Sequence, residues 1–282
     1  MNNISLGRYV PYNTLIHKLD PRTKILSMIL LMVIIFFSYG STWTNLIVYG
    51  GLGIIILVLM KMSKIKFRQV LKQLKMMWFM MLFLFIINLF TIKTPMPELG
   101  IDSFTIPGIN WTIYISAIIQ SIYIFVRLSL MISLTLILTS TTKPMDLTYA
   151  LEWMMYPLKF IKFPVHEVAM MISLALRFIP TLLDETERIM KAQASRGVDF
   201  QDGKLKEKIS AIVSLIIPLF VSAFQRSDDL ANAMEARGYD PSKKRTKYRI
   251  LKWKTRDTLS FLFIILLFSG LLVMSILGVK II

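Results

Sequence analysis

The chain contains a repeated segment, and each copy carries an arginine followed by a glycine. Arg196 and Arg237 lie in the matching segments 192–199 and 233–240, which are offset by 41 residues. On a helix each arginine would extend a small, weakly apolar stripe, because residues at i, i+3, i+4 and i+7 share one face. A groove on a partner protein could accept that stripe together with its arginine. The chemistry that these residues suggest is recognition rather than catalysis.

A simpler explanation of both arginines is helix capping. An arginine in the last turn of a helix complements the helix dipole, and glycine at the next position is the common C-terminal cap. Capping does not require a second copy, the alanine four residues before each arginine, or the aspartate two residues after each glycine. We therefore interpret the two ends as a functional pair that is also capped.

The sequence offers little material for catalysis or metal binding. It contains no cysteine and only two histidines, His17 and His166. This excludes a disulfide, a thiolate metal site and a cysteine nucleophile, and it leaves a histidine metal site poorly supported. A glycine-rich phosphate loop ending in Lys and Ser or Thr does not occur, so the chain is not itself an ATPase. We expect no catalytic, cofactor-binding or metal-binding residue, and a membrane enzyme is disfavoured on the same grounds.

Hydrophobic runs dominate the rest of the chain. Hydrophobic residues make up 55% of the 282 residues and the mean hydropathy is +0.61, which is more apolar than a usual soluble domain. Five runs are near or above the ~17–25 residues that cross a bilayer as a helix. The sequence predicts an all-α, polytopic membrane protein with about five transmembrane helices and long cytoplasmic helices. The expected regions are an N-terminal transmembrane region at 1–139 (spans at about 25–42, 43–60, 76–92 and 112–139), a cytoplasmic region with two Arg-Gly tips at 140–257, and a last span at 258–282.

The charges indicate how the spans are oriented. Lys and Arg total 33 against 17 Asp and Glu. They cluster beside the apolar runs without interleaved aromatic residues, which favours positive-inside topology and argues against nucleic-acid binding. The basic connection 61–75 belongs in the cytoplasm, whereas the connection 93–111, with one basic residue, two acids and three prolines, is expected to be an irregular outside loop. We expect a cytoplasmic N-terminus, without a signal peptide, and an extracellular C-terminus.

Residues 140–257 have a different character. They contain 20 of the 33 Lys and Arg. Their apolar stretches are short and interrupted by proline, so we do not expect them to cross the membrane. Two repeats in this region, 166–197 and 209–238, each begin with an apolar half that contains one proline, Pro180 or Pro218, and then become polar. Each repeat is expected to form a helix about 45 Å long, half against lipid or other spans and half in the cytoplasm.

Four motifs, separated along the chain, resemble those of one family. The first is GRYVP at 7–11 followed by HKLDPRTK at 17–24, and the second is PVHE at 164–167 leading to LRFIP at 176–180. The other two, Ser195-Arg196-Gly197 and Ala236-Arg237-Gly238, resemble the Ala-Arg-Gly signatures that end the coupling helices of the T components of energy-coupling factor (ECF) transporters, the EcfT/CbiQ family. Ser195 stands where the family usually has alanine, but serine is small and should still pack.

The resemblance implies a non-catalytic coupling subunit of an ECF-type ABC importer in the bacterial cell membrane. Its partners would be two EcfA-type ATPases, which would bind ATP and Mg²⁺, and one membrane S component, which would hold the vitamin or micronutrient. It implies no cofactor in this chain. Each arginine would dock into a groove of one ATPase and make forked, charge-assisted bonds to a carboxylate. The implied ATPase-coupling residues are Ser195, Arg196, Gly197, Ala236, Arg237 and Gly238.

Other features leave alternatives open. Arg127 lies in an apolar run near Gln120, where a charge is expensive, and a structural hydrogen-bonding role is favoured over a substrate site. Asp20 and Pro21 fit a helix N-cap with proline at the first helical position. The glycines at 50, 51 and 53 would allow another helix to approach closely, from a partner or from within the chain. The alternative function is a self-contained permease, although broken-helix inverted repeats are not apparent.

Overall fold

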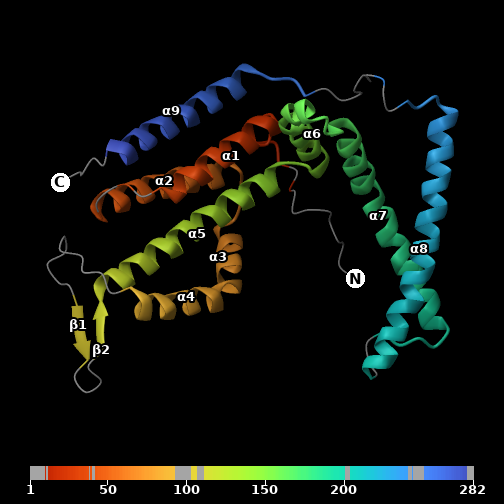
Figure 1. Cartoon of the computed structure of the whole chain (residues 1–282), viewed down its shortest axis with the longest axis horizontal. Coiled ribbons are helices and arrows are strands. Elements are labelled where there is room, and N and C mark those ends of the chain that lie inside the picture. The colour runs from red at the N-terminus through yellow and green to blue at the C-terminus, as the bar shows by residue number, and fades with distance from the viewer. Residues whose placement is uncertain are drawn as a thin grey trace. The chain divides into compact units, whose positions relative to one another are not determined.

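A computed structural model shows a chain built almost entirely of helices (Figure 1). The structure describes residues 10, 12–37, 39, 42–92, 103–106, 111–200, 204–240, 243 and 251–277. The chain divides into two compact units, Met1–Ala150 with Leu251–Ile282, and Leu151–Ile250. The elements are α1 (Pro21–Phe36), α2 (Thr42–Met62), α3 (Phe67–Met76), α4 (Trp78–Thr91), β1 (Ser103–Ile106), β2 (Trp111–Tyr114), α5 (Ile115–Thr141), α6 (Pro144–Met155), the 3-10 helix η2 (Tyr156–Ile161), α7 (Val165–Ser195), α8 (Leu205–Ala236) and α9 (Thr255–Leu277).

The helices confirm a polytopic membrane protein of all-α class, but the set of candidate spans differs from the predicted one. Within the described residues, five helices are long and apolar enough to cross a membrane, namely α2, α5, α7, α8 and α9. The pair α3 and α4, bent by 59° where they meet, would make a sixth span. α1 has 16 residues, about 24 Å of helix, so it is short for the first predicted span.

The long helices α7 and α8 correct one prediction. They have 31 and 32 residues and run without a break through Pro180 and Pro218, so the expectation that proline interrupts these apolar stretches was wrong. An internal proline removes one backbone hydrogen bond and bends a helix, but packing along the rest of the helix can maintain it. The expected length of about 45 Å for each helix is confirmed.

The first helix begins earlier than predicted and ends earlier too. Asp20 accepts a hydrogen bond from the backbone N–H of Arg22 at 2.9 Å, and Pro21 occupies the first helical position. The predicted cap is confirmed, and it places the start of α1 at Pro21 rather than near Ile25. The backbone N–H of Asp20 in turn donates to Asp257 Oδ1 at 2.7 Å, which joins the start of α1 to the first turn of α9.

A short hairpin replaces part of the loop that was predicted to be irregular. β1 and β2 pair antiparallel, with Ser103 opposite Tyr114 and Ile106 opposite Trp111. Both strands consist largely of β-branched and aromatic residues, which favour extended backbone. The remainder of 93–110 lies outside the described residues. Because β2 continues to Tyr114, α5 begins at Ile115 instead of near 112.

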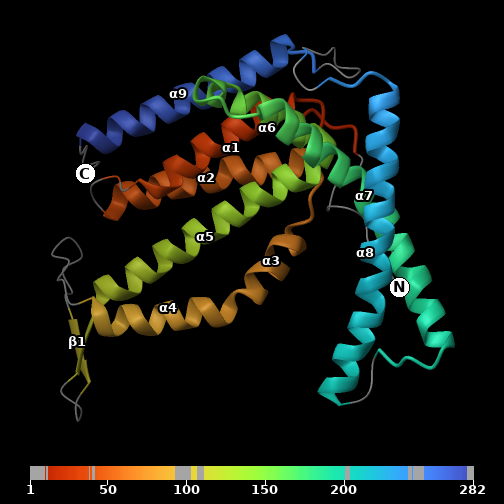
Figure 2. The same cartoon turned by 45° about the vertical axis from the view of Figure 1, so that its right-hand side comes forward.

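The core of the first unit lies where α5 meets α1, α2 and α3 and where α9 packs along α1, an arrangement that can be followed in Figure 2. Its most buried side chains include Ile34, Ile35, Leu52 and Ile56, each at most 2% exposed. These residues come from apolar runs that were predicted as spans. The glycines of α2 are not tightly packed within this unit, since a Cβ at Gly50 or Gly51 would meet nothing within 4 Å.

Arg127 of α5 satisfies the carbonyl end of α1. Its Nε donates to Tyr49 Oη at 2.8 Å and its Nη2 lies 3.4 Å from Phe37 O. Tyr49 Oη also donates to Phe37 O at 2.9 Å, and Tyr39 Oη donates to Ile34 O at 2.8 Å. Backbone carbonyls left unpaired at a helix end are costly in an apolar medium. The geometry agrees with the structural role predicted for Arg127.

Candidate partner-binding site at two helix ends

The ends of α7 and α8 have the same backbone geometry. Gly197 and Gly238 have φ values of +86° and +67°, the left-handed region that glycine adopts without steric cost. The paired hydrogen bonds of each end are Gly197 N to Ala194 O (3.0 Å) with Val198 N to Gln193 O (3.1 Å), and Gly238 N to Glu235 O (2.8 Å) with Tyr239 N to Met234 O (3.0 Å). This double pattern is the Schellman cap. Capping by both glycines is therefore real, as the sequence suggested.

Capping by glycine leaves both arginines available. Arg196 and Arg237 occupy the C-cap positions, and both are exposed. The ion pairs that the structure gives among its described residues involve neither of them. A guanidinium here complements the negative end of the helix dipole while its five donors face solvent. Two exposed, charged groups thus stand at equivalent positions on two rigid helices.

The serine that replaces alanine at the first tip is accommodated by its own helix. Ser195 Oγ donates to the carbonyl oxygen of Lys191 at 3.1 Å. Because this bond uses the hydroxyl locally, the side chain presents a surface little larger than that of alanine. Ala236 holds the equivalent position at the second tip. The departure from the family pattern at Ser195 therefore does not change the shape of the site much.

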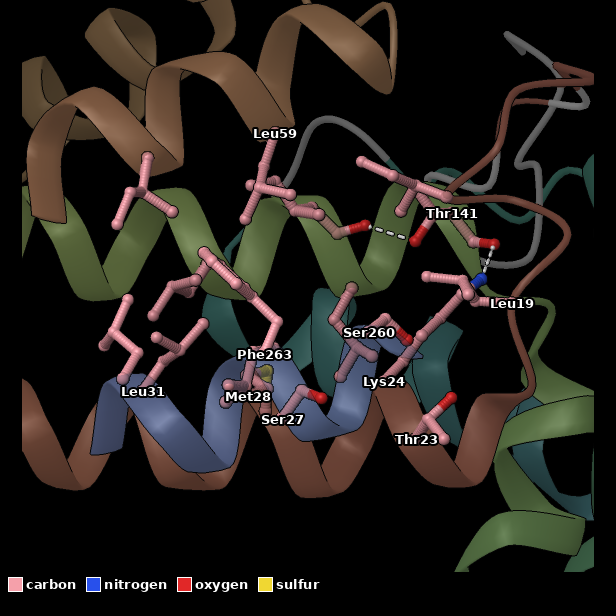
Figure 3. Close-up of a pocket in the computed structure, with 17 residues that line it drawn as sticks. Leu19, Thr23, Lys24, Ser27, Met28, Leu31, Leu59, Thr141, Ser260 and Phe263 are labelled. Atoms are coloured by element: carbon pink, nitrogen blue, oxygen red, sulfur yellow. Dashed lines mark hydrogen bonds between the residues drawn. The ribbon is translucent and has the colours of Figure 1, made fainter. Parts of the chain in front are cut away.

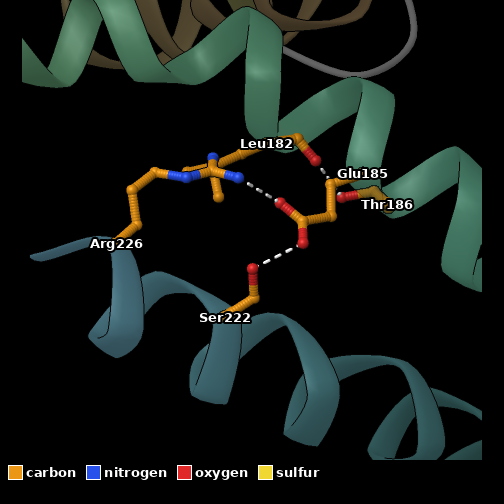
Figure 4. Close-up of polar contacts among 5 residues, drawn as sticks. All are labelled: Leu182, Glu185, Thr186, Ser222 and Arg226. Carbon is orange, nitrogen blue, oxygen red and sulfur yellow. Dashed lines mark hydrogen bonds and ion pairs between the residues drawn. The ribbon is translucent and has the colours of Figure 1, made fainter. Parts of the chain in front are cut away.

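An ion pair joins the two helices at their crossing (Figure 4). Arg226 Nη2 of α8 lies 2.8 Å from Glu185 Oε2 of α7. Ser222 donates to the other carboxylate oxygen of Glu185, and the ring of Phe178 lies 6.0 Å from the guanidinium of Arg226. The side chains of Arg226 and Glu185 are 32% and 25% exposed, so water screens this pair less than a surface pair.

This ion pair relates the two repeats by symmetry. Glu185 and Arg226 are separated by 41 residues, the same offset that relates Arg196 to Arg237. Each tip therefore lies the same number of residues beyond the crossing. Contacts of Glu185 with Ser222 and of Gln193 with Ser214 show that the helices are antiparallel, so the tips point in opposite directions. Because each tip lies 11 residues beyond the crossing and a helix rises 1.5 Å per residue, the two tips are about 30 Å apart along the helices.

Sequence reasoning did not find the Glu185–Arg226 pair. Glu185 lies in the half of the first repeat that was predicted only to be polar. The signal was available, because the 41-residue offset matches an acid in one copy with a base in the other. Glu167 and Arg177, the charged residues of the motifs 164–167 and 176–180, take part in none of the described ion pairs, whereas His166 Nδ1 lies 3.5 Å from Glu152.

The N-terminal motif 17–24 forms a junction in the first unit. His17 Nε2 lies 3.0 Å from Val10 O and its Nδ1 lies 2.7 Å from Thr14 Oγ1. Burial lowers the pKa of His17, and the positive charge of Lys24 acts in the same direction. The neutral ring would then donate from Nε2 to the carbonyl and accept at Nδ1. This geometry indicates that the motif fixes the packing of the chain entry.

Lys24 closes one end of an apolar cavity in the same unit (Figure 3). Its Nζ donates to Thr141 O at 2.9 Å and lies 3.4 Å from His17 O. The cavity has a volume of about 170 Å³ and is lined mostly by aliphatic side chains of α1, α2, α5 and α9. Since the ammonium group is already bound by carbonyls, the lining offers few polar partners to a hydrophilic solute.

The sequence matches known proteins over most of its length. The family model described as "Cobalt transport protein" (CbiQ) matches residues 12–248, which include both Arg-Gly ends. The chain is 42% identical over 258 residues to the "Energy-coupling factor transporter transmembrane protein EcfT" of Bacillus subtilis (strain 168), covering 92% of this chain and 93% of the relative. The chain belongs to the CbiQ/EcfT family.

Other members of the family are equally similar. Proteins with the same name from Macrococcus caseolyticus (43% identity; 94% of this chain and 96% of the relative) and Ruminiclostridium cellulolyticum (44% identity; 92% of each) also match almost end to end. The resemblance seen in the four sequence motifs is thereby confirmed. As an EcfT-family protein, the chain is a transmembrane T component of an ECF transporter.

Proposed function

We propose that the chain couples ATP hydrolysis by two cytoplasmic ABC ATPases to uptake of a vitamin or micronutrient held by a membrane S component. The observation that carries this proposal is the pair of exposed arginines on equivalent, capped helix ends. Two like tips, pointing in opposite directions, suit two copies of one kind of partner better than a single partner. ATP and Mg²⁺ would be bound by the ATPases, and this chain would contribute no catalytic residue.

The paired helices suggest how movement would be transmitted. Each guanidinium would be held by an acidic groove of one ATPase, where the forked donors fix both position and orientation. When ATP brings the two ATPases together, the tips would be displaced relative to each other. Helices of this length that are joined at one crossing would turn about that crossing rather than bend. Their apolar halves would then pass the displacement to the membrane region and the S component.

A self-contained permease is the alternative function. It would need a route with polar groups that converge on the solute. The cavity beside Lys24 is small and mainly aliphatic, which favours leaving substrate selection to the S component.

The proposed topology places α7 and α8 on the cytoplasmic side and the two chain ends on opposite sides. Cysteines at Glu98 and Ile282, which lie outside the described residues, should react with a membrane-impermeant maleimide on intact cells, whereas cysteines at Lys66 and Lys206 should not. Lys206 distinguishes the two possible topologies of α7 and α8. If both helices crossed the membrane as antiparallel spans, the connection between them, together with Lys206 in the first turn of α8, would lie outside the cell. The parental chain has no cysteine and gives the background. Permeabilised cells should label all four positions, and labelling of Lys206→Cys from outside would disprove the topology.

Purification of the tagged chain tests the function itself. We expect two ATPase subunits and one small membrane protein to copurify with each T subunit, and ATP hydrolysis to follow the ATPases through every fraction. The chain stripped of its partners should hydrolyse no ATP and, in proteoliposomes, transport no vitamin. Transport by the isolated chain would favour the permease, and hydrolysis in an ATPase-free preparation would overturn the non-catalytic assignment.

A further inference from the structure

The short helix α3 carries a row of positive charges on one face. Arg68, Lys72 and Lys75 lie at i, i+4 and i+7, and all three side chains are exposed. Together with Lys66, Gln69 and Leu71 they line a hollow on the surface of the first unit. Their spacing places the three charges within one sector of the helix, so a single ligand surface can contact them all.

Among the residues that the structure describes, no acidic group is paired with this row. From Pro21 to Pro97 the sequence contains no Asp or Glu, and α4 and α5, the helices that pack most extensively against α3, contain none either. The positive charge of α3 is therefore balanced by something outside these elements.

The rest of α3 has the pattern of a helix at a membrane surface. Val70 is 2% exposed and Leu74 packs against the core, so these residues anchor the helix to the unit. Phe67 and Leu71 are about half exposed and, at about 100° per residue, lie between the anchored side and the basic row. Exposed apolar residues beside a basic row are typical of helices that lie at the boundary between headgroups and acyl chains.

The length of α4 sets the depth of α3. α4 has 14 residues, about 21 Å of helix, which is less than the ~30 Å thickness of a hydrocarbon core. The chain bends by 59° between α3 and α4. If α3 and α4 together make one span, the hydrocarbon boundary falls on α3, so that Phe67 and Leu71 reach acyl chains while the long basic side chains extend to the headgroups.

We propose that α3 is a binding surface for anionic phospholipid headgroups. Arg68 would hold phosphate oxygens with its forked donors, while Lys72 and Lys75 would add point charges. A zwitterionic headgroup brings a cation into a region that has no carboxylate to receive it, so phosphatidylglycerol should be preferred over phosphatidylcholine. This inference is independent of the coupling role of Arg196 and Arg237, which lie on the other unit.

Quenching of Trp78 by brominated lipids tests the proposal locally. Trp78 begins α4, two residues after the end of α3, and is 64% exposed. The other four tryptophans of the full-length chain would be replaced by phenylalanine, and the chain would be placed in nanodiscs of phosphatidylcholine. One-fifth of the lipid would be either brominated phosphatidylglycerol or brominated phosphatidylcholine. We expect quenching of Trp78 to show a local preference for the anionic lipid over the zwitterionic lipid of roughly fivefold or more.

The variant Arg68→Gln/Lys72→Gln/Lys75→Gln should reduce this preference to near one. In the parental chain, 0.5 M NaCl should reduce the preference to the same level.

A matched variant controls for net charge. Lys204→Gln/Lys206→Gln/Lys208→Gln removes the same charge from exposed residues of the second unit and should keep the full preference. Equal quenching by both lipids in the parental chain would overturn the proposal, as would a preference that survives in the α3 variant or is lost equally in the control. The salt measurement needs no substitution in α3, so the proposal stays testable if the α3 variant folds poorly.

Discussion

Replacing both Arg196 and Arg237 by alanine should abolish copurification of the ATPases while the chain still inserts in the membrane. Truncating an arginine that is held in a desolvated partner groove costs about 2–4 kcal/mol, because the partner's carboxylate is left unpaired. This corresponds to a roughly 30- to 1,000-fold loss of affinity at each tip. Capping alone predicts far less, since dipole complementarity at an exposed helix end is worth about 0.3–1 kcal/mol and both glycines remain.

The single variants and their control distinguish docking from capping. Each single alanine should weaken binding of the ATPases and impair uptake in cells with matched amounts of the T subunit. Lysine at either tip should restore binding only in part, since it keeps the charge but loses the planar fork. As a control, Arg188→Ala removes an exposed arginine of α7, the helix whose C-cap is Arg196, and should have little effect on ATPase binding or uptake. If the double alanine variant binds both ATPases and transports at the parental rate, the tips are only caps and the coupling assignment fails.

The sequence predicted the ends of α7 and α8 because local rules determine them. A glycine after the last helical residue fixes the cap through its own φ, and the repeat places the second cap without any knowledge of packing. The start of α1 followed in the same way from Asp20 and Pro21. The continuity of α7 and α8 through Pro180 and Pro218 was not predictable in this way, since it depends on whether the remaining contacts outweigh one lost hydrogen bond.

Long-range contacts account for the rest of what sequence reasoning missed. Arg127 was expected to have a structural partner, but Tyr49 lies 78 residues away and no local spacing identifies it. The Glu185–Arg226 pair depends on where two helices cross, although the offset of the repeat pointed to it. The hairpin β1–β2 was missed because prolines and acids in the connection were given more weight than the β-branched residues on either side.

Reversing the charge of Glu185 or Arg226 alone should loosen the crossing, and reversing both should restore it. A partly buried, charge-assisted contact contributes about 1.5–3 kcal/mol, and Glu185→Arg would also set two guanidinium groups against each other. Spin labels at Ala194→Cys and Glu235→Cys, equivalent positions next to the tips, would report the distance between the helix ends. We expect one narrow distance distribution in the parental chain, a broad one in either single variant, and a narrow one again in Glu185→Arg/Arg226→Glu.

The exposed pair Glu187–Lys191 supplies the control for this prediction. Its atoms lie 2.9 Å apart on the surface of α7, with Lys191 75% exposed and Glu187 48% exposed, and such pairs contribute only about 0.3–0.5 kcal/mol. Reversing one of its charges should leave the tip distance and ATPase binding unchanged. If the crossing positions the tips, the Glu185 and Arg226 single variants should lose ATPase binding together with the narrow distance, and the double reversal should recover both. A double reversal that restores the distance without restoring ATPase binding would show that the crossing holds the helices together but does not position them for coupling.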